Sequence, residues 1–450
     1  MKKIVIFTLS FLSLSIYSQE HFSGISTSSR AGILNGNLNP AELVNLSHHF
    51  EANIFSSSFN FSNNKIGFKD IISGSNLEDK LFLGTDPVNL RVNAEILGPS
   101  FAIKIQKWGL AFTTKAMAKL DVVDIDTKFG DAIFNSGINS FLSSTTINNN
   151  YNQRFSGTTW GEVGLAAART LYDNKTHKFS AGINVKLLFP GSYANLGLDK
   201  FTGTITNSAG TAYLNNTNAN LNVAYSGGLA NSFTNFNDYS KSVFGNLNGF
   251  ATDLGVNYQW KDGDKKYKIN AGIAIKNIGT MTFNNSNNFS TNYNLNIQPT
   301  LANPNGLDLN QFANINNLKD VETVLISNGY LNTTPQKTTF KVKLPTTFTA
   351  YADLKIIPKF YATLLVQQKL NNNNDNDQIT AQNIISLTPR VNLGFFEAYT
   401  SWSKSDVSGV NGGIGFRLGG FFIGSSSAVT ALINDSKQAD IYTGFRWAFL

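Results

Sequence analysis

The chain of 450 residues has no cysteine and few charged residues, which make up 14% of it. Soluble domains average about a quarter charged residues. Without cysteine the chain cannot form a disulfide scaffold, a thiol nucleophile or a zinc ribbon. Long uncharged apolar runs are missing beyond the first residues, which argues against a helical membrane protein. The chain is rich in Phe, with 35, and has 15 Tyr, so disorder is not expected.

The first 18 residues have the pattern of a targeting segment. Met1-Lys2-Lys3 is basic, 4–17 is apolar, and Ser18 is small enough to precede a cleavage site. We expect a signal peptide over 1–18, with a retained anchor as the alternative. Lys2 and Lys3 account for two of the seven net positive charges. The remaining surplus is spread along the chain, so no nucleic-acid partner is expected.

Hydrophobicity follows a period of two in the mature chain. In 90–96, 101–106, 179–189 and 267–275, apolar residues alternate with polar or small ones. Such alternation predicts strands with one apolar and one polar face. The strands are longer than the globular mean of about 5–6 residues and reach the 9–11 that cross a bilayer. Charged residues on the polar face suit a wet lumen better than a sandwich core.

The predicted strands alternate between short turns and long loops. We place them at 50–61, 90–106, 109–120, 158–171, 179–189, 252–260, 266–276, 346–355, 359–369, 378–388, 392–402, 408–417, 419–428 and 440–449. This layout is typical of an outer-membrane barrel. An amphipathic sheet in lipid must close, so we predict an all-β fold: a closed antiparallel transmembrane β-barrel of about 14 strands over 50–450. An even count puts both termini in the periplasm, with the Asn-rich segments 284–288 and 371–374 in external loops.

The last strand carries a further signal. Phe445, Trp447 and Phe449 form one apolar stripe, and Phe449 is next to the last residue. This ending resembles the recognition signal of barrels that the outer-membrane assembly machinery inserts, which would then be a partner together with membrane lipid. The alternative is an edge strand of a soluble protein.

Two short motifs resemble the long-chain fatty-acid transporter (FadL-like) barrels. Asn39, Pro40 and Ala41 match the Asn-Pro-Ala of their N-terminal hatch, and Leu344-Pro345 is similar to the start of a mid-chain strand. The layout resembles the Bacteroidetes branch, which includes barrel subunits of the type IX secretion system. The resemblance implies fourteen strands and a hatch over 19–49 inside the lumen. The alternative is an ordinary turn before the first strand.

Two sets of residues are candidates for contact with a solute. Charged residues on the polar face either set solute preference or pair with one another and hold the plug: Arg91, Glu95, Lys104, Lys115, Lys119, Lys186 and Lys268. Apolar residues at helical spacing predict an amphipathic helix over 307–328: Phe312, Ile315, Leu318, Val321 and Leu325. A second helix is expected over 131–142. These helices would form an apolar pocket at the outer mouth, or else pack against the loops.

Catalytic signals are weak. There is no Gly-x-Ser-x-Gly elbow, and no acid–base constellation is apparent. The adjacent His48 and His49 would point to opposite faces of a strand and cannot chelate one metal together. We therefore expect no enzyme, no cofactor and no metal site. Two functions remain open: passive passage of hydrophobic or amphipathic small molecules, and a docking role as a subunit of an outer-membrane secretion or assembly complex.

Overall fold

The computed structural model describes residues 20–74, 76–134, 144–230, 244–261, 267–284, 288–312, 315, 317–332 and 337–449. The predicted signal peptide over 1–18 lies outside these residues. So do residues 262–265, between the strands predicted at 252–260 and 266–276, and the last part of the predicted helix over 131–142.

The described chain forms one antiparallel sheet that closes into a barrel with fourteen wall positions, which confirms the predicted fold class. The last strand pairs with the first and closes the ring. Two short strands separated by Gly98 and Pro99 share one wall position. In ring order the wall contains β1 (Phe50–Asn63), β2 (Val88–Leu97) with β3 (Ser100–Ile105), β4 (Trp108–Ile125), β6 (Asn152–Asp173), β7 (His177–Ser208), β9 (Gly249–Lys261), β10 (Tyr267–Asn284), β14 (Thr347–Ile357), β15 (Phe360–Lys369), β16 (Ile384–Asn392), β17 (Phe396–Ser405), β18 (Gly409–Leu418), β19 (Phe421–Ser425) and β20 (Gln438–Phe449).

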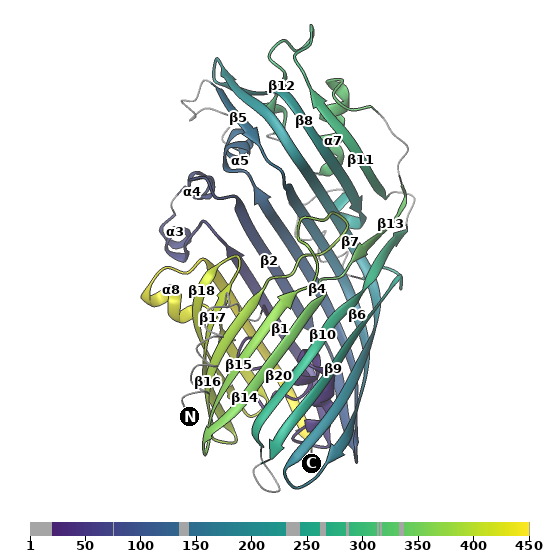
Figure 1. Ribbon diagram of the computed structural model, residues 1–450, viewed down its shortest axis with the longest axis vertical. Helices are drawn as coiled ribbons and strands as arrows, with labels where there is room; N and C mark the ends of the chain where they lie inside the picture. The colour runs from purple at the N-terminus through teal and green to yellow at the C-terminus, as the bar shows by residue number, and fades with distance from the viewer. Residues whose placement is uncertain are drawn as a thin grey trace, which may run out of the picture.

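The connections lie as the sequence predicts, with short turns at one end of the barrel and longer loops at the other. The C-terminal strand β20 (Gln438–Phe449) ends at the short-turn end in Figure 1. Short turns occupy 106–107, 174–176, 358–359, 393–395 and 419–420. The loops at the long-loop end include 64–87, 126–151, 209–248 and 370–383.

One predicted strand is placed wrongly. We predicted a strand over 378–388, with Pro389 in the connection to the next predicted strand, but β16 begins at Ile384 and contains Pro389. The ladder from β16 to β17 resumes at Arg390 after Leu387, so Pro389 sits where no pair is formed with β17. A residue without a backbone N–H is tolerated at such an interruption. Because β16 begins at Ile384, the segment 370–383 forms a long connection between β15 and β16.

The outer face of the barrel is a continuous apolar belt. Every wall position contributes at least one exposed large apolar side chain: Phe59, Ile96, Phe112, Leu165, Ile183, Leu254, Ile273, Leu354, Leu364, Leu387, Trp402, Ile414, Phe421 and Ile441. Trp108, Trp260 and Trp447 are also exposed near the short-turn ends of their strands. An apolar band with aromatic residues near its edge is the surface that a bilayer requires of a barrel.

Some strands continue past the barrel at the long-loop end, where further strands join the same sheet, and we call this part the extension (Figure 1). β7 has 32 residues, several times the length needed to cross a bilayer. β5 (Ser144–Asn148) and β8 (Thr211–Ser226) pair with its far half, while β11 (Phe289–Ile297) and β12 (Leu307–Asp308) pair with β8. β13 (Thr339–Lys343) pairs with the far half of β10.

The residues predicted to line a loop pocket pack in or against the core of the extension. The helix α7 covers only Leu318–Ser327, since β12 and the 3-10 helix η4 (Leu309–Phe312) precede it and Asn317 caps its first turn. Leu318 and Leu325 are buried in the core of the extension, and Phe312 and Val321 pack against that core. Ile315 is half-buried between η4 and α7. The alternative, loops packed on one another, is what the structure contains.

The remaining helices are short. They are α2 (Ile33–Leu38), the 3-10 helix η2 (Pro40–Asn45), α3 (Phe68–Ser73), α4 (Leu77–Leu81), α5 (Thr127–Phe134), the 3-10 helix η3 (Gly227–Ala230) and α8 (Ala428–Ile433). Within the described ranges, no helix combines the length and the apolar character needed to cross a membrane.

Candidate functional site

The N-terminal segment 20–49, which we call the hatch, lies inside the barrel. Apolar hatch side chains, including Phe22, Ile25 and Leu43, are buried in one cluster with the wall residues Phe422 and Tyr442. The Tyr442 hydroxyl also donates a 2.6 Å hydrogen bond to the backbone oxygen of Ser23. A barrel of this size has a lumen that wall side chains alone do not fill, so an inserted segment supplies part of its core.

A row of small wall residues makes room for the hatch. Gly109, Ala168, Gly182, Gly255 and Ala274 are register partners across five neighbouring strands, from β4 to β10. The hatch backbone lies against this row: a Cβ added to Gly182 would be 2.5 Å from Pro40 C and Ala41 N. A Cβ on Gly109 would meet the backbone of Leu43. The row is thus a seat for η2, because any larger side chain would occupy the same space.

The Asn-Pro-Ala motif holds the start of η2 on this seat. The Asn39 side-chain oxygen accepts a 3.0 Å hydrogen bond from Ala41 N and caps the helix, while Pro40 is its first residue. The Asn39 amide donates to Val256 O on the wall at 3.0 Å. One buried side chain therefore starts the helix and fastens it to β9.

Glu42 provides the next attachment. Its carboxylate is 4% exposed and accepts hydrogen bonds from Asn257 at 2.9 Å, from Asn270 at 2.8 Å and from the Tyr351 hydroxyl. Asn45, also on the hatch, donates to its second oxygen at 2.7 Å. The charge is stabilised by neutral donors from three wall strands, which is the arrangement that a buried carboxylate needs.

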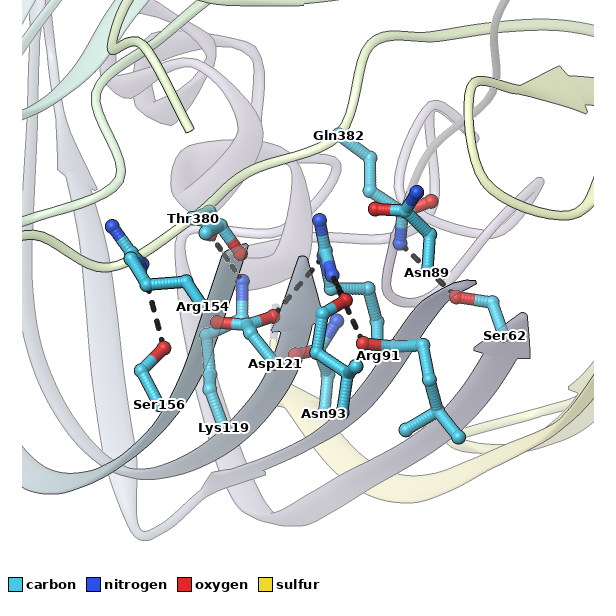
Figure 2. A network of polar contacts seen from close by, with 12 residues as sticks. Ser62, Asn89, Arg91, Asn93, Lys119, Asp121, Arg154, Ser156, Thr380 and Gln382 are labelled. Carbon is cyan, nitrogen blue, oxygen red and sulfur yellow. Dashed lines mark hydrogen bonds and ion pairs between the residues drawn. The ribbon is translucent and has the colours of Figure 1, made fainter. Parts of the chain in front are cut away.

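The connection 370–383 enters the lumen from the long-loop end, and we call it the infolded loop. Arg154 on β6 is fully buried and donates to Gln378 O at 3.1 Å and to Asp375 O. Lys119 on β4 donates to Thr380 O at 3.0 Å. Figure 2 shows these wall side chains reaching the loop, with Gln382 beside Ser62 at 3.3 Å. We predicted a strand from residue 378 onward, and this placement is corrected here, because β16 begins only at Ile384.

Glu20 connects the hatch to the infolded loop. Its carboxylate accepts from Asn93 at 3.0 Å and from Gln382 at 3.3 Å, and it forms a 3.3 Å ion pair with Lys119. Burial raises the pKa of Glu20, but Lys119 and His21 outweigh burial and leave that pKa below its ordinary value. Burial lowers the pKa of His21, with Glu95 and Glu20 opposing the shift. Glu20 is therefore ionised at neutral pH and holds the two inserted segments together.

A cavity of about 100 Å³ remains between the hatch and the infolded loop. That volume holds about three waters, at roughly 30 Å³ each. Its lining includes four lysines and three glutamates: Lys115, Lys119, Lys186, Lys276, Glu20, Glu95 and Glu162. Three of these lysines have a carboxylate partner, whereas no described carboxylate lies within ion-pair distance of Lys276. We call this cavity the chamber.

Most of the predicted lumen residues point inward and are paired. The ion pairs are Arg91–Asp121 at 3.2 Å, Glu95–Lys115 at 3.2 Å, Lys119–Glu20 at 3.3 Å and Lys186–Asp253 at 2.8 Å. Lys104 lies near the short-turn end and donates to Leu46 O of the hatch at 3.4 Å. Pairing with one another and with the hatch, one of the two roles considered, accounts for these contacts.

Lys268 is the exception. A register irregularity between Tyr267 and Ile269 turns Tyr267 inward and leaves Lys268 exposed over the ring of Trp260, 5.4 Å from its centroid. The prediction that Lys268 lines the lumen is wrong, because strict alternation was assumed through a bulge.

The residues of the predicted assembly signal lie on β20. Phe445 and Trp447 are exposed on the outer face, and Phe449 is the last residue of the strand. The side chain of Phe449 lies outside what the structure describes. Recognition by the assembly machinery stays a prediction.

The sequence reasoning missed Glu20, Glu42, Arg154 and the small-residue row. Arg154 lies near the start of β6, four residues before the strand that we predicted over 158–171. Alternation extended toward the N-terminus would have placed it inward. Glu20 and Glu42 lie in a segment without periodicity, where no pattern indicates what a carboxylate contacts.

The chain was compared with known families, curated proteins and solved structures. The model described as "Family of unknown function (DUF5723)" matches residues 40–426. No curated protein matches the chain. Among solved structures, a TodX deltaS2S3 mutant monoaromatic hydrocarbon channel is 10% identical, with a TM-score of 0.46 and coverage of 96% of this chain and 98% of that one. The CymD monoaromatic hydrocarbon channel is 10% identical, with a TM-score of 0.41 over 96% and 94%. The P. putida toluene transporter TodX is 9% identical, with a TM-score of 0.41 over 91% and 92%.

Proposed function

We propose that the chain, which belongs to DUF5723, a family of unknown function, provides passive passage of amphipathic or hydrophobic small molecules across the outer membrane. In this proposal the short-turn end and both termini face the periplasm. The hatch and the infolded loop close the lumen, and displacement of the hatch opens it.

The observation that carries the proposal is that two inserted segments fill the lumen. Each one is held to the wall by hydrogen bonds and ion pairs that water can replace, such as those of Glu42 and Arg154. The chamber between them has a charged lining, which favours a solute with a polar group over a pure hydrocarbon. The FadL-like resemblance of Asn39-Pro40-Ala41 agrees with a movable hatch.

A disulfide that fixes the hatch to the wall tests passage. The hydroxyls of Ser23 on the hatch and Ser401 on β17 are 2.6 Å apart and both residues are buried. The chain has no native cysteine, so Ser23→Cys with Ser401→Cys has a single pairing. In proteoliposomes we expect oxidation of this double variant to reduce uptake of a fluorescent medium-chain fatty acid at least tenfold, with recovery after reduction.

The single variant Ser23→Cys is the matched control, because it carries the same substitution without a partner thiol. Its uptake should be the same before and after reduction. Equal uptake by the oxidised and reduced double variant would exclude movement of the hatch as the route. If liposomes that contain the reduced barrel took up the fatty acid no faster than empty liposomes, the proposal of passage would be contradicted.

The extension favours a second candidate function, a docking platform in a secretion or assembly complex. It carries its own apolar core outside the barrel, including Phe201, Leu221 and Leu295, and so has the construction of a folded extramembrane domain. Mild detergent extraction of an affinity-tagged chain, followed by mass spectrometry, is the test. A stoichiometric partner would support docking, and recovery of the barrel alone would count against it.

A further inference from the structure

The wall has a notch at the short-turn end between β19 and β20. β19 pairs with β20 only from Phe421, opposite Phe445, and the turn 419–420 ends that side of the wall. Arg446 N still donates to Gly420 O at 3.0 Å, but Trp447 and Ala448 extend beyond the turn and pair only with β1. A cavity of about 420 Å³ occupies this step, within the usual size range of ligand pockets.

The lumen side of the notch is cationic. Arg30 of the hatch, Arg417 of β18 and Arg446 of β20 line it together with His48, whereas Glu51 is the one carboxylate among the lining residues. Glu51 is paired with Arg446 at 3.4 Å, and Glu397, which lies behind the lining, is paired with Arg417 at 3.5 Å. No acceptor among the described residues contacts the guanidinium of Arg30. Because Arg446 and Arg417 each have a carboxylate partner, the guanidinium of Arg30 is the unpaired positive charge of the notch among the described residues.

Two of these arginines are buried with donors to spare. Arg417 is 3% exposed and Arg446 is 8% exposed. Arg417 donates to Gly419 O at 2.7 Å and to Gly394 O at 2.8 Å, and Arg446 donates to Arg30 O, yet the Nε of each is buried without a hydrogen-bond partner among the described atoms. A buried donor without an acceptor is costly, so an anion in the notch would be stabilised there.

The other side of the notch is apolar and continuous with the belt. Phe395, Phe445 and Trp447 line the same cavity and are 69%, 41% and 57% exposed. Phe445 and Trp447 point outward from β20, on the strand face that carries Ile441. A ligand in the notch would therefore contact guanidinium groups at one end and aromatic rings on the lipid-facing side at the other.

We propose that the notch binds the anionic headgroup of an amphiphile, such as an acidic phospholipid, with its hydrocarbon tail along Phe395 and Trp447. Arginine forks suit phosphate and carboxylate groups, and basic pockets next to lipid select acidic headgroups. This site does not depend on passage, because the notch is separate from the chamber and is present while the lumen is closed.

Native mass spectrometry of the full barrel in neutral detergent tests the site. The probes are dioleoylphosphatidylglycerol, zwitterionic dioleoylphosphatidylcholine and inorganic phosphate. We expect the wild type to prefer phosphatidylglycerol, and Arg30→Gln to weaken its binding about fivefold, the effect of one cation beside an acidic headgroup. Phe395→Ser should weaken binding of phosphatidylglycerol and leave any binding of inorganic phosphate unchanged. Arg30 and Phe395 are suitable positions because neither donates a hydrogen bond to the wall from its side chain.

Arg169→Gln is the matched control. Arg169 lies near the short-turn end, 5.1 Å from the ring centroid of Trp108. Its substitution removes the same positive charge at a place away from the notch. Heat-modifiable gel mobility confirms that each variant is folded. An equal loss of phosphatidylglycerol binding in Arg30→Gln and Arg169→Gln would overturn the proposal. Equal binding of the two lipids by the wild type would also overturn it. Displacement of phosphatidylglycerol by equimolar inorganic phosphate would also overturn it, since the notch would then be a plain anion site.

Discussion

Gly182→Val is expected to push the hatch off the wall and open the lumen to ions. The new side chain would occupy the space of Pro40 and Ala41, whose backbone atoms are 2.5 Å from the position of its Cβ. Overpacking of this kind costs about 1–3 kcal/mol, which lowers the ratio of closed to open barrels roughly 5- to 150-fold. In planar bilayers the variant should show frequent long openings where the wild type is mostly closed.

Ala181→Leu is the control for this substitution. Ala181 is the neighbouring residue on β7 and lies on the lipid-facing side, so the variant adds the same number of carbon atoms outside the lumen. Its conductance should equal that of the wild type. A silent Gly182→Val barrel with wild-type gel mobility would show that the small-residue row does not hold the hatch in place.

Arg154→Met is expected to release the infolded loop. The substitution leaves Gln378 O and Asp375 O without their charged donor inside the lumen, at a cost of about 1.5–3 kcal/mol for each bond. We expect limited proteolysis to cleave within 370–383 at least tenfold faster in this variant than in the wild type. The position of the cut, read by mass spectrometry, is the measurement.

Arg91→Met is the control for the loop. Arg91 is equally buried, but its partners among the described residues are wall groups, namely Asp121 and the backbone oxygens of Leu90 and Val122. Its loss should lower the thermal stability of the barrel and leave 370–383 protected. If both variants were cleaved alike, loop release would merely reflect a weakened wall.

The strands were predictable because alternation is a local property. Each residue of 90–96 needs only its neighbours to show which face it lies on, and Arg91 and Glu95 do point inward. The prediction fails where the backbone breaks the period, as at Lys268. A bulge of this kind depends on the partner strand, which the local pattern does not contain.

The closure of the lumen was predictable only in part. The Asn-Pro-Ala resemblance placed a segment inside the barrel, but its seat is assembled from residues on five strands, far apart in sequence. A glycine in a strand, such as Gly255, indicates that a ligand or another backbone approaches closely, but it does not identify which segment does so. The infolded loop escaped notice because Asn371–Asn374 and Gln382 have the composition of a solvated loop. The wall partners of this loop, such as Asn152 for Asn374 O and Arg154 for Gln378 O, are more than two hundred residues away in the chain.

The central claim is that the hatch and the infolded loop together close a wide lumen, and single-channel conductance tests it most directly. The variant to measure combines Gly182→Val with Arg154→Met, since it loosens both segments while the wall strands keep their pairing. We predict a mostly closed wild type, brief or partial openings for each single variant, and a large stable conductance for the combination. A combined variant that is folded yet as silent as the wild type would contradict the claim.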